Sequence, residues 1–215
     1  MARLSSSLEI RRLGRVVYAD ALALQEELRE RLGRGEIGET VLLLEHPDVI
    51  TFGRGAKPES ALLGDPELRR GGYEVFRVNR GGDATWHGPG QLVGYPILDL
   101  RRHGADVHRY LRTLEGVLIA ALADFGIAAG RRDGYAGVWL DARRKIASIG
   151  VGLRAWRTLH GFALNVDCDL ARFAAIVPCG LAGVEMVSMK SVLGRPVALE
   201  EVADRVELEL AKAFQ

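Results

Sequence analysis

Two cysteines are the candidate nucleophiles of this 215-residue chain. The thiolate is the reactive form of a cysteine, and the charges around the sulfur control how readily it forms. Cys168 lies between two aspartates, whose negative charge would raise the pKa of its thiol. Cys179 lies between a proline and a glycine, which leave the sulfur approachable and add no charge. The comparison favours Cys179, although either cysteine is also compatible with a small buried hydrophobic residue.

Lys145 is the candidate group to assist a cysteine. Only four of the 29 basic residues are lysines, and arginine cannot lose its proton. If Lys145 faces inward beside a thiol, it either accepts the thiol proton or stays charged and stabilises the thiolate. The competing interpretation is a solvated basic strand end, because two arginines precede it. His160 is a second candidate partner for a cysteine, with a hydrogen-bonded core histidine as its alternative.

Residues 80–91 form the segment with the most unusual composition, RGGDATWHGPGQ. Four glycines and a proline predict a defined loop with exposed backbone amides. Arginine, threonine, histidine and glutamine add side-chain donors within the same twelve residues. The pattern favours a cradle for a polar group such as a carbonyl or a phosphate. A glycine-rich hairpin whose polar side chains face water is the alternative.

Several motifs of well-known chemistry are missing. The sequence contains no GxxxxGK[ST] phosphate loop, no GxGxxG after a strand, no HExxH and no CxxC pair. Its five histidines and two cysteines do not form a recognisable set of metal ligands. We therefore expect neither a P-loop nor a Rossmann nucleotide site, and we predict no metal and no cofactor.

Composition narrows the class of protein further. A content of 48% hydrophobic and 27% charged residues is typical of a globular chain, and a net charge of +1 gives no general case for nucleic-acid binding. The longest apolar run, residues 117–123, is far too short for a membrane span, and the first residues lack a signal-peptide core. Two cysteines do not make a disulfide framework. We expect a cytoplasmic protein, with residues 1–215 forming one domain and no membrane partner.

Periodic apolar residues predict the helices that must hold these groups in place. Residues 18–32 carry leucines four residues apart and end at a glycine. Residues 106–125 give the strongest pattern, with Asp106 as N-cap and Gly126 as the stop. A short helical piece is expected over 171–176, and a charged amphipathic helix over 199–214.

Short apolar runs predict the strands. They cover residues 41–45, 49–52, 73–79, 92–98, 137–140, 145–153 and 158–166. The last three are separated only by short turns, which favours an antiparallel meander and leaves no room for helices between them. The pattern predicts an α+β fold, in which helices cover a mixed, mostly antiparallel central sheet.

Three segments, in order along the chain, resemble one family. They are RGGDATWHGPGQLVGYPI at 80–97, KIASIGVGLRAWRTLHGFALNV at 145–166 and VPCGL at 177–181. Together they resemble the lipoyl(octanoyl) transferases, which move an octanoyl group from acyl carrier protein to lipoyl domains. The resemblance implies the fold of the biotin and lipoate protein ligases, with helices on both sides of the sheet.

The resemblance also implies a role for particular residues. Cys179 matches the acyl-thioester nucleophile, and Lys145 matches the lysine that lowers the pKa of that thiol. The matched substrate-binding residues are Arg80, Gly81, Gly82, Asp83, Ala84, Thr85, Trp86, His87, Ser148, Ile149, Gly150, Gly161, Phe162 and Ala163.

The implied reaction proceeds in two steps. The Cys179 thiolate attacks octanoyl-acyl carrier protein and forms an octanoyl-enzyme. A lysine amine of a lipoyl domain then attacks to give an amide, the first step of endogenous lipoate synthesis. Lys145, or a water held by His87, would take the proton of that amine. The implied acceptors are the lipoyl domains of 2-oxoacid dehydrogenases and the glycine cleavage H protein.

Two further expectations concern selectivity. An apolar tunnel that ends at Ile149 and Phe162 would select the acyl chain length, since each buried CH₂ contributes about 0.8 kcal/mol. Arginine pairs at positions 69–70, 101–102, 131–132 and 143–144 are candidate docking sites for the acidic partner proteins, or ordinary solvated surface.

Three other functions compete with this one. An ATP-dependent lipoate or biotin ligase of the same fold would require ATP and a free acid. A thiol hydrolase that pairs Cys179 with His160 or His87 would release free octanoate. A non-catalytic module that binds carrier protein would bind without turnover.

Overall fold

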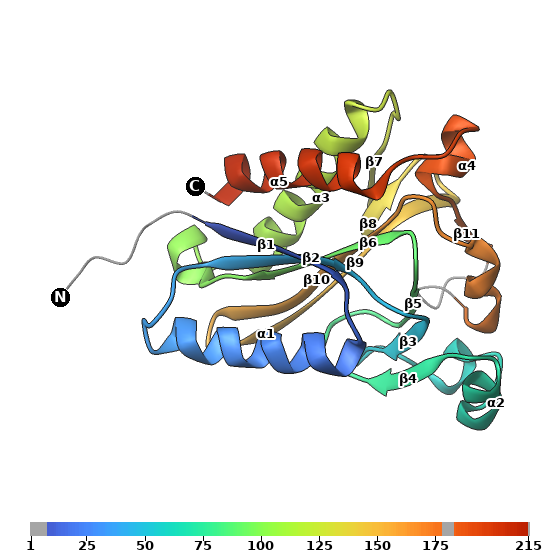
Figure 1. The fold of residues 1–215 in the computed structure, drawn as a ribbon, viewed down its shortest axis with the longest axis horizontal. Helices are drawn as coiled ribbons and strands as arrows, with labels where there is room; N and C mark the ends of the chain where they lie inside the picture. Colours follow the sequence, from blue (N-terminus) through green and yellow to red (C-terminus); the bar gives the residue numbers. More distant parts are fainter. Residues whose placement is uncertain (1–7, 178–182, 215) are drawn as a thin grey trace.

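A mixed sheet of eight strands forms the centre of the part of the chain that the computed structural model describes, residues 8–177 and 183–214 (Figure 1). Its strands are β1 (Glu9–Arg15), β2 (Thr40–Glu45), β6 (Gln91–Ile97), β7 (Gly130–Arg132), β8 (Tyr135–Trp139), β9 (Arg144–Arg154), β10 (Arg157–Asn165) and β11 (Glu185–Met186). Seven of them lie in the order β1-β2-β6-β10-β9-β8-β7, and β11 pairs with the start of β9. Only the β1–β2 and β11–β9 pairs are parallel. The mixed, mostly antiparallel sheet expected for an α+β fold is confirmed.

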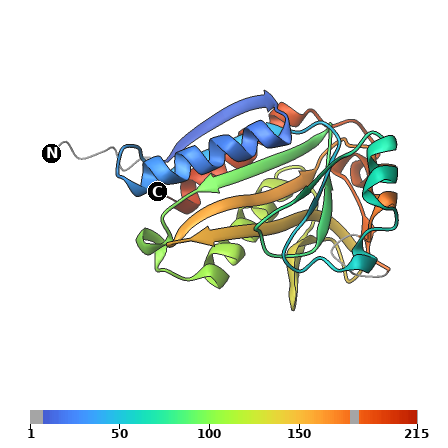
Figure 2. The same ribbon diagram turned by 90° about the horizontal axis from the view of Figure 1, so that it is seen from below.

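Helices cover both faces of this sheet, as Figure 2 shows from a second direction. Helix α1 (Tyr18–Gly33) packs Ala21, Leu28 and Leu32 on one face. Helices α3 (Val107–Ala123) and α5 (Leu199–Phe214) lie on the other face. The predicted N-cap of α3 is present, because the Asp106 carboxylate accepts a hydrogen bond from the Arg109 N–H at 3.0 Å.

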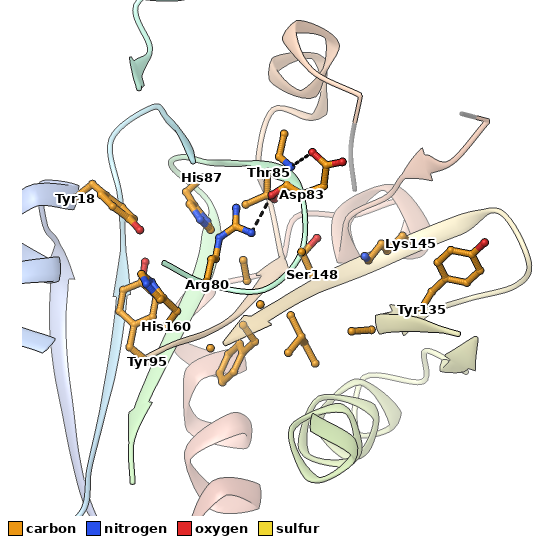
Figure 3. A pocket seen from close by; sticks show the side chains of 18 of the residues that line it. Tyr18, Arg80, Asp83, Thr85, His87, Tyr95, Tyr135, Lys145, Ser148 and His160 are labelled. Atoms are coloured by element: carbon orange, nitrogen blue, oxygen red, sulfur yellow. Dashed lines mark hydrogen bonds between the residues drawn. The ribbon is translucent and has the colours of Figure 1, made fainter. Parts of the chain in front are cut away.

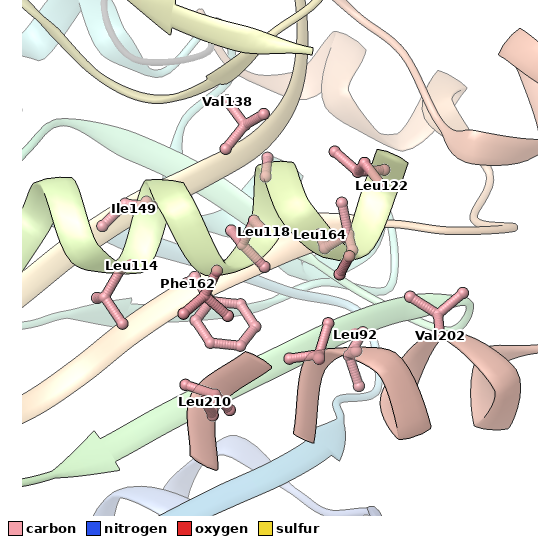
Figure 4. Close-up of a cluster of buried hydrophobic side chains, with 14 of the residues drawn as sticks. Leu92, Leu114, Leu118, Leu122, Val138, Ile149, Phe162, Leu164, Val202 and Leu210 are labelled. Carbon is pink, nitrogen blue, oxygen red and sulfur yellow. The ribbon is translucent and has the colours of Figure 1, made fainter. Parts of the chain in front are cut away.

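The larger core lies between the sheet and the pair α3 and α5 (Figure 4). Leu114 and Leu118 of α3 and Leu210 of α5 meet Phe162 and Leu164 of β10 there. All five side chains are at most 2% exposed. Because helices cover both faces, a central strand such as β2 is apolar at four successive positions, 41–44, instead of alternating with polar residues.

A second, smaller sheet lies beside the first. Its strands are β4 (Glu74–Arg77), β3 (Val49–Phe52) and β5 (Ala84–His87), in that order. Around this sheet run α2 (Asp65–Arg70) and the 3₁₀ helices η1 (Pro58–Ser60) and η3 (Leu170–Ala175). The remaining elements are η2 (Leu100–His103) and α4 (Met189–Leu193).

Comparison with the predicted elements gives agreement and some corrections. The meander over 137–166 is present as β8, β9 and β10, which are antiparallel neighbours. The predicted strands 73–79 and 92–98 lie in different sheets, because β5 interrupts the glycine-rich connection and pairs with β3. The short helical piece expected over 171–176 is the 3₁₀ helix η3, Leu170–Ala175, and β1, α2 and α4 were not predicted.

No helix in the described part of the chain is long and apolar enough to cross a membrane.

Candidate active site

A cavity of about 190 Å³ lies where the two sheets meet (Figure 3). Its walls come from the start of α1, from residues 80–87, and from the facing strands β8, β9 and β10. Twelve of the fourteen predicted substrate-binding residues line it: Arg80, Gly82, Asp83, Ala84, Thr85, His87, Ser148, Ile149, Gly150, Gly161, Phe162 and Ala163. Segments that are far apart in the sequence thus line the same cavity.

Lys145 also lines this cavity, at the beginning of β9. It is only 2% exposed, and its Nζ lies 5.0 Å from the centre of the Trp139 ring. Gly137 borders the amine so closely that a Cβ there would lie 3.1 Å from Nζ and 2.6 Å from Cε. The solvated strand end considered above is therefore wrong for Lys145.

Cys179 and its VPCGL neighbours at 178–181 lie outside the described residues. The described chain on either side of them is anchored by backbone hydrogen bonds. On one side, the Val177 N–H donates to the Ser60 carbonyl at 3.0 Å. On the other side, Met186 is paired with Lys145, and the Val187 N–H donates to the Lys145 carbonyl at 2.9 Å.

The guanidinium of Arg80 shapes the glycine-rich wall of the cavity. It donates to the carbonyl and hydroxyl oxygens of Thr51 at 2.7 and 2.8 Å, and to the carbonyls of Gly81 and Asp83 at 3.0 and 2.9 Å. A Cβ at Gly53 would lie 2.4 Å from the Gly82 carbonyl oxygen, so glycine is needed for this close approach. Arg80 thus holds residues 80–83 against β3, and direct substrate binding by Arg80 stays a prediction.

Two residues predicted to bind substrate do not line the cavity. The Gly81 N–H donates to the Val151 carbonyl at 2.8 Å, which ties the loop to β9. Trp86 is 1% exposed and packs against Phe173 on the other side of the small sheet, where its Nε1–H donates to the Asp48 carboxylate at 2.8 Å. Side chains alternate along a strand, so Thr85 and His87 of β5 face the cavity and Trp86 faces away.

Three histidines are buried in or beside the cavity. His46 uses both ring nitrogens, since Nδ1 donates to the Val16 carbonyl and Nε2 accepts from the Tyr95 hydroxyl, each at 2.7 Å. Burial lowers the pKa of His46 and of His160 to about 4. His87 is bonded through Nδ1 to Oε1 of Gln91 at 2.8 Å, and burial also lowers its pKa well below the ordinary value.

The far end of the cavity is apolar. Phe162 and Ile149 are paired across β10 and β9, and both belong to the core that α3 covers. The Phe162 ring occupies the space above Gly94 of β6, where an added Cβ would lie 2.1 Å from the ring. These residues give the cavity a wall of the kind expected for an acyl chain.

The comparisons with known proteins agree with this arrangement. Residues 17–211 match the lipoyl protein ligase A/B catalytic domain. The octanoyltransferase of Geobacter metallireducens is 53% identical over 193 residues, 90% of this chain and 87% of that protein. The octanoyltransferase of Solibacter usitatus is 51% identical, over 95% of this chain and 92% of that protein. This chain belongs to the octanoyltransferase family.

Solved structures of lipoate and biotin protein ligases have a fold similar to that of this octanoyltransferase. A putative lipoate protein ligase from T. acidophilum with bound lipoic acid has a TM-score of 0.69 at 17% identity, over 96% of this chain and 85% of that one. The biotin protein ligase from Aquifex aeolicus in complex with biotin and ATP has a TM-score of 0.59 at 14% identity, over 96% and 70%. At such identities the likeness shows the fold alone, and it confirms the predicted ligase-like architecture.

Sequence reasoning missed part of this octanoyltransferase's cavity. Tyr18, Tyr95 and Tyr135 line it, together with Gly134 and Ala136. Tyr18 opens α1, and Tyr95 lies in β6 among apolar residues, so neither stands out from a core position. The only signal in the sequence for Tyr18 and Tyr95 is that each places a polar hydroxyl group at what is otherwise an apolar, buried position.

Cys168 differs sharply from a reactive cysteine. It is 8% exposed in the cluster around Trp86, and it does not line the cavity. Burial raises the pKa of its thiol to about 12, and the flanking Asp167 and Asp169 add to that rise. Cys168 is therefore a thiol at neutral pH, and the octanoyltransferase's other cysteine is Cys179.

Proposed function

We propose that this chain transfers an octanoyl group from octanoyl-acyl carrier protein to a lysine of a lipoyl domain, through a thioester on Cys179. Lys145 assists by stabilising the thiolate or by accepting its proton. Residues 1–215 would act as one catalytic domain, in the cytoplasm and without a cofactor. Family membership supports the octanoyl transfer, whereas the cysteine–lysine pair rests on the chemistry of the cavity.

The buried Lys145 carries the proposal. Its amine is 2% exposed and lines the cavity, where the charged form would stabilise a nearby anion more strongly than it would in bulk water. β11, which begins six residues after Cys179, pairs directly with Lys145. A thiolate held near this amine would be stabilised by the charged form of the lysine and would be the nucleophile that acyl transfer requires.

The cavity also suits the other parts of the reaction. Backbone N–H groups of the glycine-rich wall are suitable donors for the oxyanion that forms when the thioester carbonyl is attacked. The apolar end at Ile149 and Phe162 would hold the octanoyl chain. The donor would be octanoyl-acyl carrier protein, and the acceptors the lipoyl domains of 2-oxoacid dehydrogenases and the glycine cleavage H protein.

Intact-protein mass spectrometry after mixing with octanoyl-acyl carrier protein, in the absence of ATP, tests the proposal. The wild-type protein should gain one octanoyl group, and a lipoyl domain should remove it. Cys179→Ala should gain nothing. Cys168→Ala is the matched control, since it removes the other cysteine and should acylate as the wild type does. Lys145→Met should acylate far more slowly than the wild type.

Other outcomes identify the competing functions. A protein that modifies lipoyl domains only when ATP and free octanoate are supplied is a ligase. Release of free octanoate as the main product identifies a hydrolase. Binding of carrier protein with no mass gain, with or without ATP, identifies a binding module.

A further inference from the structure

His87 ends β5 and lines the cavity, with only 7% of its surface exposed. Its Nδ1 lies 2.8 Å from Oε1 of Gln91, the first residue of β6. With Nδ1 engaged in this way, the other ring nitrogen, Nε2, is left on the side of the cavity, where Figure 3 shows the ring beside Arg80. No group of residues 8–177 and 183–214 forms a hydrogen bond with that Nε2.

A chain of hydrogen bonds decides which nitrogen of His87 carries the proton. Asn165 must turn its Nδ2 toward the Val187 carbonyl, 3.0 Å away, because a carbonyl only accepts. Its Oδ1 then faces Gln91 and accepts from Nε2 of that residue at 2.9 Å. Gln91 Nε2 also donates to the Trp86 carbonyl at 3.2 Å. The remaining Gln91 oxygen must accept from His87, so Nδ1 holds the proton.

The neutral ring therefore presents a lone pair on Nε2 to the cavity. Burial lowers the pKa of His87 well below its ordinary value, and the positive charge of Arg80 acts in the same direction. The bond to Gln91 works against this effect but does not outweigh it. At neutral pH the imidazole is unprotonated and ready to accept a proton.

The same chain of bonds ties His87 to Lys145. Val187, which receives the bond from Asn165, donates its own N–H to the Lys145 carbonyl at 2.9 Å. Gln91 and Asn165 are each 1% exposed, so water does not compete for these bonds. Two groups able to move protons are thus fixed relative to each other on the walls of one cavity.

We propose that His87 is the catalytic base of the second half-reaction, in which the octanoyl group passes to the acceptor lysine. This role rests on the function proposed above. If Lys145 stays charged to stabilise the thiolate, it cannot also take the proton of the amine, and a different group is needed for that proton. Both ring nitrogens of His46 are already bonded. His160 also lines the cavity, but no hydrogen bond in the described part of the chain fixes its proton, whereas the proton of His87 is fixed on the far nitrogen.

The second half-reaction forms one C–N bond and breaks one C–S bond. The lysine enters as a free amine, and its nitrogen attacks the thioester carbon, forming the C–N bond, a positively charged nitrogen and an oxyanion that re-forms the carbonyl in the next step. On the tetrahedral carbon this nitrogen is a stronger acid than an ordinary alkylammonium ion, and neutral Nε2 of His87 takes one proton from it. The C–S bond then breaks, and Cys179 leaves as a thiolate. The negative thiolate and the positive imidazolium balance the charge, and the product is the octanoyl amide.

Isolated octanoyl-enzyme separates the two half-reactions. The enzyme is loaded with octanoyl-acyl carrier protein, purified, and mixed with a lipoyl domain, and the loss of its octanoyl mass is timed. His87→Gln should still form the octanoyl-enzyme, but its discharge by the lipoyl domain should slow by about 100-fold or more, the usual contribution of a general base. His108→Gln, at an exposed histidine, is the matched control and should discharge at the wild-type rate.

Two further measurements distinguish a base from a structural residue. Hydroxylamine attacks thioesters at neutral pH without a base, so it should discharge the His87→Gln octanoyl-enzyme at about the wild-type rate. In His87→Ala, added imidazole should restore discharge by the lipoyl domain. Gln91→Leu, which removes the oxygen that fixes the proton on Nδ1, should slow the discharge by a smaller factor.

Three results would overturn the role of His87. Discharge of His87→Gln by the lipoyl domain within twofold of the wild-type rate removes the need for a base. Equal loss of the lipoyl-domain and hydroxylamine reactions, without rescue by imidazole, makes His87 structural. If the wild-type protein forms no octanoyl-enzyme, the proposed function fails, and the role of His87 fails with it.

Discussion

The side-chain oxygen of Gln25, in α1, accepts a hydrogen bond from the backbone N–H of His160 at 2.8 Å. His160 lies in the middle of β10 with φ of +59°, a conformation that residues other than glycine rarely adopt. Its N–H consequently points to the helix instead of a neighbouring strand, and Gln25, itself fully buried, is its acceptor. A strained backbone conformation of this kind persists only where surrounding contacts stabilise it. Here the bond to Gln25 stabilises the conformation of His160, a residue that lines the cavity.

Replacing Gln25 should therefore destabilise the protein. Gln25→Leu leaves the His160 N–H buried without an acceptor, and we expect the free energy of unfolding to fall by about 1–2 kcal/mol, as measured with urea. Glu27→Ala is the control on the same helix, because it removes only the exposed Arg31 ion pair at 3.3 Å. Equal stability of Gln25→Leu and the wild type would show that the bond does not hold His160 in place.

The buried histidines should make the protein acid-sensitive. The folded-state pKa of His46 and His160 is about 4, below the ordinary value of 6.5, so the unfolded chain binds more protons between these limits. The stability that they contribute is fully present above pH 6.5 and is lost as the pH falls toward 4. At pH 5 each costs about 2 kcal/mol. Urea unfolding at pH 7.5 and pH 5 measures the difference.

Single variants assign that pH dependence. His160→Asn keeps a residue that tolerates positive φ but cannot ionise, so it should lose less stability between pH 7.5 and pH 5 than the wild type does. His108→Gln, at an exposed position, should keep the wild-type difference. The same loss in all three proteins would place the acid sensitivity elsewhere.

Gly137 should be as important as the lysine it borders. It has φ of +123°, and a Cβ there would lie 2.6 Å from Cε of Lys145 and 2.5 Å from the Ala147 carbonyl oxygen. Gly137→Ala should displace the amine and slow formation of the octanoyl-enzyme, by up to about 100-fold for a shift of 1 Å. Gly130→Ala in the same hairpin is the control, because its Cβ meets no atom within 4 Å. Similar acylation rates in both variants would contradict the tight fit.

The sequence predicted best those elements whose stability is local. Helix α3 has its own N-cap and apolar stripe, and the β8–β9–β10 meander has short turns, so both are readable from neighbouring residues. β1 gave no such signal, since its sequence EIRRLGR is charged. It is held from a distance by its pairing with β2 and by Arg12, which bonds to Asp204 and Glu207 of α5.

The sequence also predicted only part of the cavity, namely the residues in local motifs. Its motif residues could be named from the sequence because they cluster within 80–87, 148–150 and 161–163. The direction in which each side chain points could not, and Trp86 is the example: its strand β5 exists only because β3 pairs with it, and that pairing turns the indole away. The relay from His87 through Gln91 and Asn165 joins residues up to 74 positions apart, which no local pattern reveals.

Charge reversal tests whether the arginines that precede Lys145 dock the partner proteins. Arg143 and Arg144 are exposed and directly precede Lys145 at the start of β9, although Arg144 is paired with Asp141 at 2.7 Å. Arg143→Glu should raise KM for octanoyl-acyl carrier protein several-fold at low salt, with kcat little changed. Arg34→Glu is the control, because Arg34 is an exposed arginine outside the candidate pairs, at the end of α1 opposite to Tyr18, which lines the cavity. Equal KM values in both variants would exclude this docking site.

Phe162 should set the length of the acyl chain that the cavity accepts. Its ring closes the apolar end above Gly94, so Phe162→Leu opens space there without adding a polar group. Longer chains then bury more CH₂ groups, each contributing about 0.8 kcal/mol, and the preference should move from eight carbons toward ten. Competition between carrier proteins loaded with acyl chains of six to twelve carbons measures it. Leu164→Val shrinks a neighbouring side chain in the same core that does not line the cavity, so it should keep the wild-type preference. An unchanged preference in Phe162→Leu would mean that the chain ends against another wall.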